Sequence, residues 1–194
     1  LFRVMAEMDT TSPPNPSNVP FRDLALRYGA IWAVTGVFIT LISFLTDTEP
    51  GLPNTPGIWK AVYSIVGIGI AVWVIVTAIK IDRDQQLGGF ISLGRCLGLG
   101  VTTSLVAAVL SVIYMYIHMT LINPGYLDVI REDSIAQMSE RGMSEAEIEQ
   151  AMEFASFFMG PVFISIIQVV FTVFLGFIIS LIAGLVMKRE RTLI

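Results

Sequence analysis

Few side chains in this sequence could do acid–base or nucleophilic chemistry, and His118 and Cys96 are the most distinctive of them. Each is the only residue of its type among 194 residues. One cysteine excludes an intrachain disulfide and a metal site built from several cysteines. The sequence shows no nucleophile beside a base and no cluster of metal ligands. We therefore expect no catalytic residue, no metal and no cofactor, and a protein that is not an enzyme.

Two polar side chains fall within long apolar segments. His118 could relay a proton or bind a ligand, or it could be an interfacial histidine that bonds to a neighbouring group or to water. We favour the second interpretation because the apolar segments supply no second ligand. Gln168 is expected to hydrogen-bond across helices, with contact to a substrate as the alternative.

The glycine-rich stretch QQLGGFISLGRCLGLG, residues 85–100, raises the question of a phosphate-binding loop. A Walker loop needs Lys and then Ser or Thr after its last glycine, but Gly94 is followed by Arg95 and Cys96. A dinucleotide fingerprint needs a third glycine, which is missing after Gly98-Leu99-Gly100. This stretch therefore does not predict a phosphate site.

Small residues spaced by about four positions suggest another role for these glycines. Gly94 and Gly98 share one helix face. Further small residues follow at similar spacing at Ser104, Ala108 and Ser111, and at Gly176, Ser180 and Gly184. Such faces let two membrane helices approach closely. We expect the third and fourth apolar segments to pack through some of them, or a partner or second copy to bind there.

Basic residues between the second and third apolar segments are candidate contacts to lipids or to a partner. They are Lys80, Arg83 and Arg95. Such residues can hold a lipid phosphate at a membrane surface. The alternative, which we favour, is the ordinary excess of basic residues beside a membrane, with local ion pairs.

Four long apolar segments dominate the chain, which is 54% hydrophobic and only 14% charged. A typical soluble domain carries about 25% charged residues, and a helix needs about 20 apolar residues to cross a bilayer. The segments cover residues 28–46, about 58–79, about 96–122 and 161–187. We predict an all-α membrane protein with four transmembrane helices, in contact with membrane lipids and without a nucleic-acid partner.

The distribution of basic residues predicts how the chain crosses the membrane. Nine of the 12 Lys and Arg residues lie before the first segment, between the second and third, or after the fourth. Since basic residues collect on the cytoplasmic side, both termini should be cytoplasmic. Residues 1–27 lack an apolar core and predict a disordered cytoplasmic tail rather than a cleaved signal peptide. Residues 28–190 should then form one transmembrane domain.

Residues 123–160 should form an extracytoplasmic segment between the third and fourth membrane helices. Pro124 disfavours helical geometry at Asn123, so the third helix should end near residue 122. Asn123 then suits an N-cap and Pro124 a first helical position. A first outer helix is expected to continue to about residue 141, with Gly142 as its stop.

A second outer helix is expected over residues 144–159. Ser144 and Glu147 have the spacing of a capping box, which starts a helix. Apolar side chains share one face of this segment and acidic side chains occupy the other. The pattern predicts an amphipathic helix near the outer membrane surface.

The chain resembles a known family on four stretches that follow one another in order: LRYGAIWAVTG, IKIDRDQQLGGFISLGRCLGLG, INPGYLD and MSEAEIEQAME. In this order and spacing it resembles domain of unknown function 4199 (DUF4199) over about residues 21–190. The resemblance implies a Gram-negative bacterium with two membranes, and hence the inner membrane. It implies no catalytic residue, because the family has no established activity.

Our leading hypothesis is a non-enzymatic accessory or scaffold subunit that acts through its small-residue helix faces and its outer helix. The alternative is a lipid-handling helper of an enzyme of polyprenyl phosphates or envelope glycans, with Arg83 and Arg95 holding a lipid phosphate. A small oligomeric transporter or channel is third, since it needs a polar pore face. The sequence leaves the ligand, the partner, the oligomeric state and the start codon open.

Overall fold

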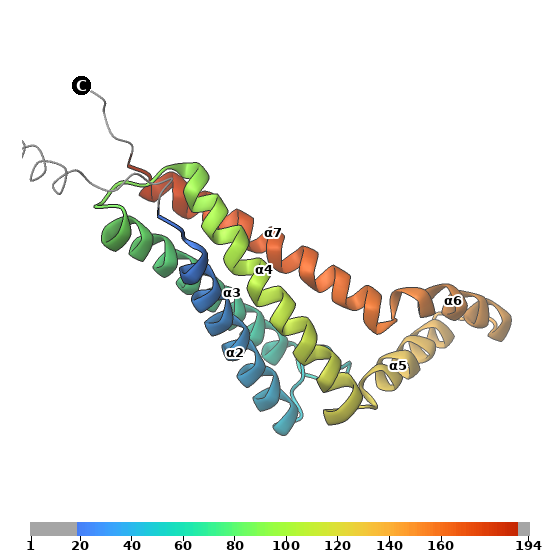
Figure 1. Ribbon diagram of the computed structural model, residues 1–194. Coiled ribbons are helices and arrows are strands. Elements are labelled where there is room, and N and C mark those ends of the chain that lie inside the picture. Colours follow the sequence, from blue (N-terminus) through green and yellow to red (C-terminus); the bar gives the residue numbers. More distant parts are fainter. Residues whose placement is uncertain (1–18, 190–194) are drawn as a thin grey trace, which may run out of the picture.

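The computed structural model describes residues 19–189 (Figure 1). These residues form helices and the turns that connect them, with one isolated bridge between Ile91 and Arg189. The body contains four long helices: α2 (Arg22–Leu45), α3 (Gly57–Ile81), α4 (Leu93–Ile117) and α7 (Pro161–Met187). Two π-helical turns extend α3 and α4: η2 (Asp82–Gln86) and η3 (His118–Ile122). Two shorter helices, α5 (Tyr126–Glu140) and α6 (Glu145–Phe158), form a hairpin between α4 and α7.

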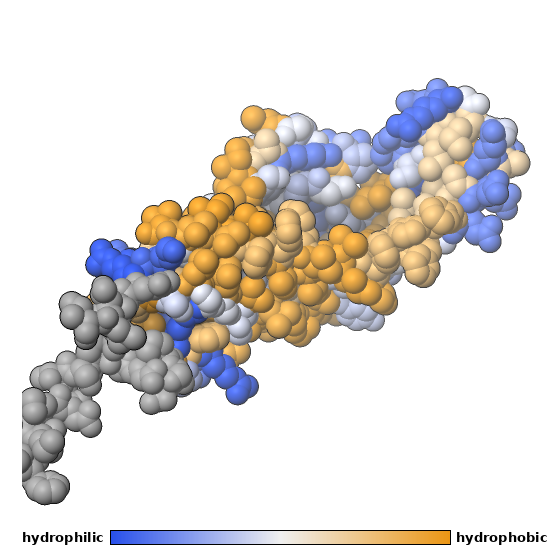
Figure 2. Space-filling model, turned by 90° about the horizontal axis from the view of Figure 1, so that it is seen from above, coloured by the Kyte–Doolittle hydropathy of each residue, from blue (hydrophilic) through white to orange (hydrophobic). Residues whose placement is uncertain are grey.

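Four helical segments among the described residues are long and apolar enough to cross a membrane. They are Arg22–Leu45, Gly57–Gln86, Leu93–Ile122 and Pro161–Met187. Apolar side chains cover much of the body, and hydrophilic side chains gather toward its two ends (Figure 2). The predicted all-α fold with four membrane-spanning helices is confirmed to that extent.

The two ends of the body carry different parts of the chain. Residues 19 and 189, where the described chain starts and stops, lie at one end, which we call the terminal end (Figure 1). The α2–α3 connection, residues 46–56, and the start of α5 lie at the other, which we call the loop end. The chain therefore crosses the body four times and returns to the end at which it began.

The first membrane helix begins earlier than the sequence predicted. α2 starts at Arg22, with Asp23 in its first turn, where a carboxylate favours the positive end of the helix dipole. Leu24 and Ala25 are buried in the core and hold this first turn in place. The disordered tail predicted for residues 1–27 is therefore wrong for residues 22–27, and residues 1–18 lie outside the described part of the chain.

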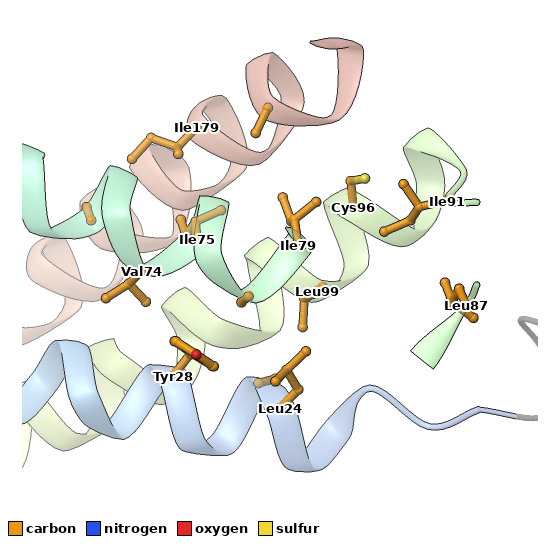
Figure 3. Packing of buried hydrophobic residues seen from close by; sticks show 14 residues of the cluster. Leu24, Tyr28, Val74, Ile75, Ile79, Leu87, Ile91, Cys96, Leu99 and Ile179 are labelled. Carbon is orange, nitrogen blue, oxygen red and sulfur yellow. The ribbon is translucent and has the colours of Figure 1, made fainter. Parts of the chain in front are cut away.

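The hydrophobic core lies in the half of the bundle nearest the terminal end. Figure 3 shows Leu24 and Tyr28 of α2, Val74, Ile75 and Ile79 of α3, Cys96 and Leu99 of α4 and Ile179 of α7 as members of one buried cluster. Leu87 and Ile91, from the connection between η2 and α4, extend it toward the terminal end. The four long helices are thus held together mainly at this end.

α4 and α7 approach closely through small residues. A Cβ atom added at Gly100 would lie 2.6 Å from Ser180 Oγ, and one added at Gly176 would overlap Ser104. One added at Gly184 would lie 3.0 Å from Cys96 Cβ. The predicted residues Gly176, Ser180 and Gly184 therefore do face α4.

The glycines predicted on the partner face lie elsewhere. Gly94 has no atom within 4 Å of an added Cβ, and Gly98 faces the ring of Phe21, with 3.4 Å between an added Cβ and Phe21 Cζ. The α4 face that meets α7 is shifted to Gly100 and Ser104, because α7 packs on that side of α4. Within the described chain, Gly94 and Gly98 do not form the expected contact with α7.

The two predicted outer helices form with boundaries close to those expected. Gly142 has a φ of 79°, the left-handed conformation of a helix stop. The capping box of α6 is present: Ser144 Oγ accepts from the Glu147 amide, and the Glu147 carboxylate accepts from the Ser144 amide. These contacts lower the pKa of Glu147, through the Ser144 backbone amide first and its hydroxyl second.

α7 begins at the hairpin, apart from the other long helices, and joins the bundle only toward the terminal end (Figure 1). The five buried residues of α7 all lie from Gly176 onward, and none is buried between residues 161 and 175. α5 has no buried residue, and Met152 is the buried residue of α6. This part of the molecule therefore presents most of its side chains outward.

Candidate functional site: the loop end of the bundle

The α2–α3 connection turns one carboxylate inward. Glu49 is 4% exposed, although Asp47 and Pro50 on either side are exposed. Its carbonyl accepts hydrogen bonds from the Leu52 amide at 3.0 Å and from Thr55 Oγ1 at 2.6 Å. These contacts close the loop on itself and direct the Glu49 side chain toward the end of α4.

Both carboxylate oxygens of Glu49 have partners from the other side of the bundle. His118 Nε2 lies 2.7 Å from Oε1, and Asn123 Nδ2 donates to Oε2 at 2.7 Å. A buried carboxylate is costly unless it is hydrogen-bonded in this way. The three side chains, which we call the Glu49 cluster, therefore tie the α2–α3 connection to the end of α4 and to the start of α5.

His118 is 1% exposed and is enclosed by aromatic rings. Tyr114 Oη lies 3.3 Å from its Nδ1, and the rings of Phe44 and Tyr126 meet it edge-on, at centroid distances of 5.7 and 6.4 Å. Both ring nitrogens of His118 thus have a polar partner, the Glu49 carboxyl group for Nε2 and the Tyr114 hydroxyl for Nδ1.

The π-helical turn η3 begins at His118 and ends just before Asn123. The Asn123 amide donates to the His118 carbonyl at 2.7 Å, so both ends of the turn belong to the Glu49 cluster. Isolated π-helical turns are frequent at functional sites. The role predicted for Asn123 is wrong: α5 begins at Tyr126, its N-cap is Gly125, and no side chain caps it. The Asn123 amide group binds Glu49 instead.

Tyr126, the first residue of α5, completes the site. Burial raises the pKa of its phenol, and the negative charge of Glu49 raises it further. The hydroxyl lies directly against Gly51, where an added Cβ would overlap it. The start of the hairpin is thus packed against the α2–α3 connection through a contact that only glycine allows.

The chemistry available at this end is proton exchange and cation binding. The side chains that meet here are a carboxylate, an imidazole, an amide and phenols. A carboxylate hydrogen-bonded to an imidazole can hold a proton, and its charge attracts cations. Within a membrane protein such a pair is a functional-site candidate by default.

A second buried polar cluster lies at the terminal end. The Arg95 guanidinium binds Asp82 through two hydrogen bonds of 2.7 and 2.8 Å, and Asp82 is fully buried. The Arg95 guanidinium also donates to the Val19 carbonyl at 2.8 Å and lies 5.2 Å from the ring centre of Phe21. Arg95 was considered as a contact for lipid phosphate. The structure instead places its guanidinium inside the protein, where it joins η2 to α4.

The remaining predicted residues are not brought together. Lys80 is exposed, and Arg83 forms an ion pair of 2.6 Å with its neighbour Asp84. Gln168 is half-buried on the part of α7 that leaves the bundle. Of the side chains singled out in the sequence, His118 lies at the loop-end site and Arg95 at the terminal-end cluster.

Comparison with known families agrees with the stretches quoted above. A profile of the family described as "Protein of unknown function (DUF4199)" matches residues 27–189. The chain belongs to the DUF4199 family. No curated protein and no solved structure matches it. The Glu49 cluster and the Asp82–Arg95 pair both lie within the matched DUF4199 region.

Sequence reasoning missed the partners of His118. Glu49 lies outside the apolar segments and has no local motif that marks it, and Asn123 was predicted to be a helix cap. The available signal was topological: four crossings place the end of the first segment beside the end of the third. Glu49 follows the first segment and His118 lies near the end of the third, 69 residues further along the chain.

Proposed function

We propose that this DUF4199 protein is a non-enzymatic accessory subunit of a bacterial inner-membrane complex, and that it binds a partner protein through α7 and the α5–α6 hairpin. The departure of α7 from the bundle carries the proposal. Residues 161–175 form half of a membrane helix and contain no buried side chain, whereas the half from Gly176 onward packs on α4. The first half is thus available to another helix.

The hairpin supports the same conclusion. Phe154 and Phe157 of α6 are 73% and 71% exposed, although they lie outside the four apolar segments. Together with Phe158 and Phe163 they form an aromatic group at the corner between α6 and α7. Exposed aromatic side chains outside a membrane span mark protein or membrane contacts. The group continues the exposed side of α7, so both belong to one surface.

The orientation follows from the basic residues. Since basic residues collect on the cytoplasmic side, the terminal end should be cytoplasmic and the loop end extracytoplasmic. The return of the chain to its starting end agrees with both termini lying on one side (Figure 1). The hairpin and the Glu49 cluster would then meet partners from the periplasmic side.

Lipid handling is the second candidate, favoured by an apolar cavity of about 290 Å³ between α3 and α7. Val72, Val76, Ile179 and Val186 are among its lining residues, and their side chains would suit an acyl chain. Phosphate contacts would then fall to Lys80 and Arg83, because Asp82 already holds Arg95. A small oligomeric transporter or channel stays third.

Site-specific photo-crosslinking in native membranes tests the proposal. A photoreactive side chain replaces Val162, Ile166 or Val170, which are exposed on the free half of α7. Val186, 81% exposed on the packed half, is the matched control. We expect one discrete protein adduct from the first three positions and none from Val186, with a fixed stoichiometry by native mass spectrometry.

Other outcomes would redirect the proposal. Lipid adducts alone at all four positions would contradict a partner at α7. An anionic lipid that copurifies with the protein and is lost in Arg83→Ala would favour lipid handling. Ion or solute flux in liposomes would favour a transporter, and turnover of a substrate by the purified protein would exclude a non-enzymatic role.

A further inference from the structure

A cavity of about 170 Å³ adjoins the Glu49 cluster. Its wall combines α2, the α2–α3 connection, α3, α4 with η3, and α5, so that five parts of the chain meet around it. Its exposed wall residues are Pro50 and Gly51, which places the mouth on the α2–α3 connection. The cavity does not depend on a partner chain, because the bundle itself builds it.

The charge of the wall selects the kind of ligand. Glu49 and His118 are its acid and base, and none of the described residues that line the cavity is Lys or Arg. Glu49 therefore meets no lysine or arginine charge on the described wall of the cavity. Glu49 uses one acceptor site on each oxygen for His118 and Asn123, and a carboxylate has about four such sites. It can therefore accept an N–H group of a primary ammonium ion, or lie against the positively charged methyl groups of a quaternary one.

The rest of the wall suits an organic cation better than a metal ion. Tyr63, Tyr126 and His118 contribute rings, and aromatic faces attract ammonium groups. Hydroxyl groups come from Thr40 and Ser43. A bound metal ion would need several free oxygen ligands, whereas the cavity offers one carboxylate whose oxygens both already accept hydrogen bonds. No group of metal-ligating side chains is found in the described part of the chain.

We propose that this cavity binds a small ammonium group, with Glu49 as its counter-ion and the rings of Tyr63 and Tyr126 around it. The volume is close to that of a cavity that binds benzene, about 150 Å³, so choline or ethanolamine is of suitable size. The ammonium group has two possible sources. It is the head of a phospholipid such as phosphatidylethanolamine, or it is a free amine that enters past Pro50 and Gly51.

Calorimetric titration of the full chain in nanodiscs of phosphatidylglycerol tests the site. The probes are choline, ethanolamine and 3,3-dimethylbutan-1-ol, a neutral isostere of choline. We expect saturable binding of choline or ethanolamine and none of the neutral alcohol. Glu49→Gln should weaken binding at least tenfold, while Glu153→Gln, which removes a charge from the exposed face of α6, should leave it unchanged. Three results would overturn the proposal: the alcohol binds as tightly as choline, Glu49→Gln binds as tightly as the wild type, or neither choline nor ethanolamine binds.

A second variant covers the case in which Glu49→Gln fails to fold. Thr40→Leu fills the cavity without touching the Glu49 cluster, and costs only a hydrogen bond from Thr40 Oγ1 to the Gly36 carbonyl. It should abolish amine binding in a protein that keeps its thermal unfolding temperature, and full binding by this variant would exclude the cavity.

Mixed nanodiscs distinguish the two sources. If added phosphatidylethanolamine weakens the binding of free ethanolamine to the wild type, the lipid head group competes for the cavity and is the occupant. An unchanged affinity identifies a free amine as the ligand.

Discussion

Replacing Gly100 by alanine should separate α4 from α7. The added Cβ would lie 2.6 Å from Ser180 Oγ and 3.5 Å from the Gly176 carbonyl oxygen. The added Cβ would also overlap Ser180 Cβ. Non-bonded carbon atoms normally approach one another to about 3.5–4.0 Å, so the helices must move apart by more than about 1 Å. They cannot do so locally, because Ser104 meets Gly176 in the same way one turn along the helix.

The size of this effect follows from a matched control. Overpacking a well-packed contact costs about 1–3 kcal/mol, whereas alanine in place of a helical glycine gains about 0.5–1 kcal/mol. Gly94→Ala on the same helix has the gain without the clash, since its Cβ meets no atom within 4 Å. The difference between the two variants therefore isolates the clash, at about 1–3 kcal/mol.

The chain contains its own reporter of this contact. Cys96 is the only cysteine, is fully buried, and lies beside Gly184 where α4 meets α7. Its rate of reaction with a thiol reagent reports how often the helices separate. Since about 1.4 kcal/mol is a factor of ten, Gly100→Ala should react about 5 to 150 times faster than Gly94→Ala in detergent. Equal rates, with equal unfolding temperatures, would refute the close contact.

Three further predictions concern the polar contacts. Asp82→Asn should lower stability by about 3–5 kcal/mol, because it leaves the Arg95 charge buried without its carboxylate; in thermal unfolding, the double variant Asp82→Leu with Arg95→Met should recover much of the loss, and no recovery would contradict a simple pair. Ser144→Ala should speed hydrogen exchange of the Glu147 amide about fivefold. In the wild type the Ser144 amide, which donates to the Glu147 carboxylate, should be fully protected above the ordinary carboxyl pKa and should lose this protection as pH falls through the lowered pKa of Glu147. Protection of the Ser144 amide that persists after the carboxylate is protonated would argue against the capping box. Gly51→Ala should displace Tyr126 and speed exchange at the start of α5, whereas Gly57→Ala, which meets no atom within 4 Å, should not; identical exchange in both would mean that the Tyr126 contact does not hold the hairpin.

The apolar segments and the start and stop signals of helices could be predicted from the sequence because they are local. A run of about 20 apolar residues must be helical in a membrane, since the bilayer offers no other partner to the backbone. Gly142 and the Ser144–Glu147 capping box likewise act within one helical turn. The start of α2 was missed because Arg27 ends the apolar run and Arg22 and Asp23 lie before it. Only the burial of Leu24 and Ala25 shows that the helix continues there.

The contact between α4 and α7 could be predicted only in part from the sequence. Small residues at spacing of four occur on two faces of α4, through Gly94 and Gly98 and through Gly100 and Ser104. Either face would allow close approach, so spacing alone does not choose between them. The position of α7 decides, because it brings Gly176 and Ser180 against the second face.

The sequence by itself determined that the chain has four helices long and apolar enough to cross a membrane and a helical segment between the third and fourth, since both follow from composition and from signals within one turn. The tertiary structure alone decided which polar side chains meet. Glu49 and His118 are 69 residues apart, and Asp82 and Arg95 are 13 apart across a turn. A buried charge needs a partner within about 3 Å, and the folding of distant helices, rather than any local pattern, supplies it.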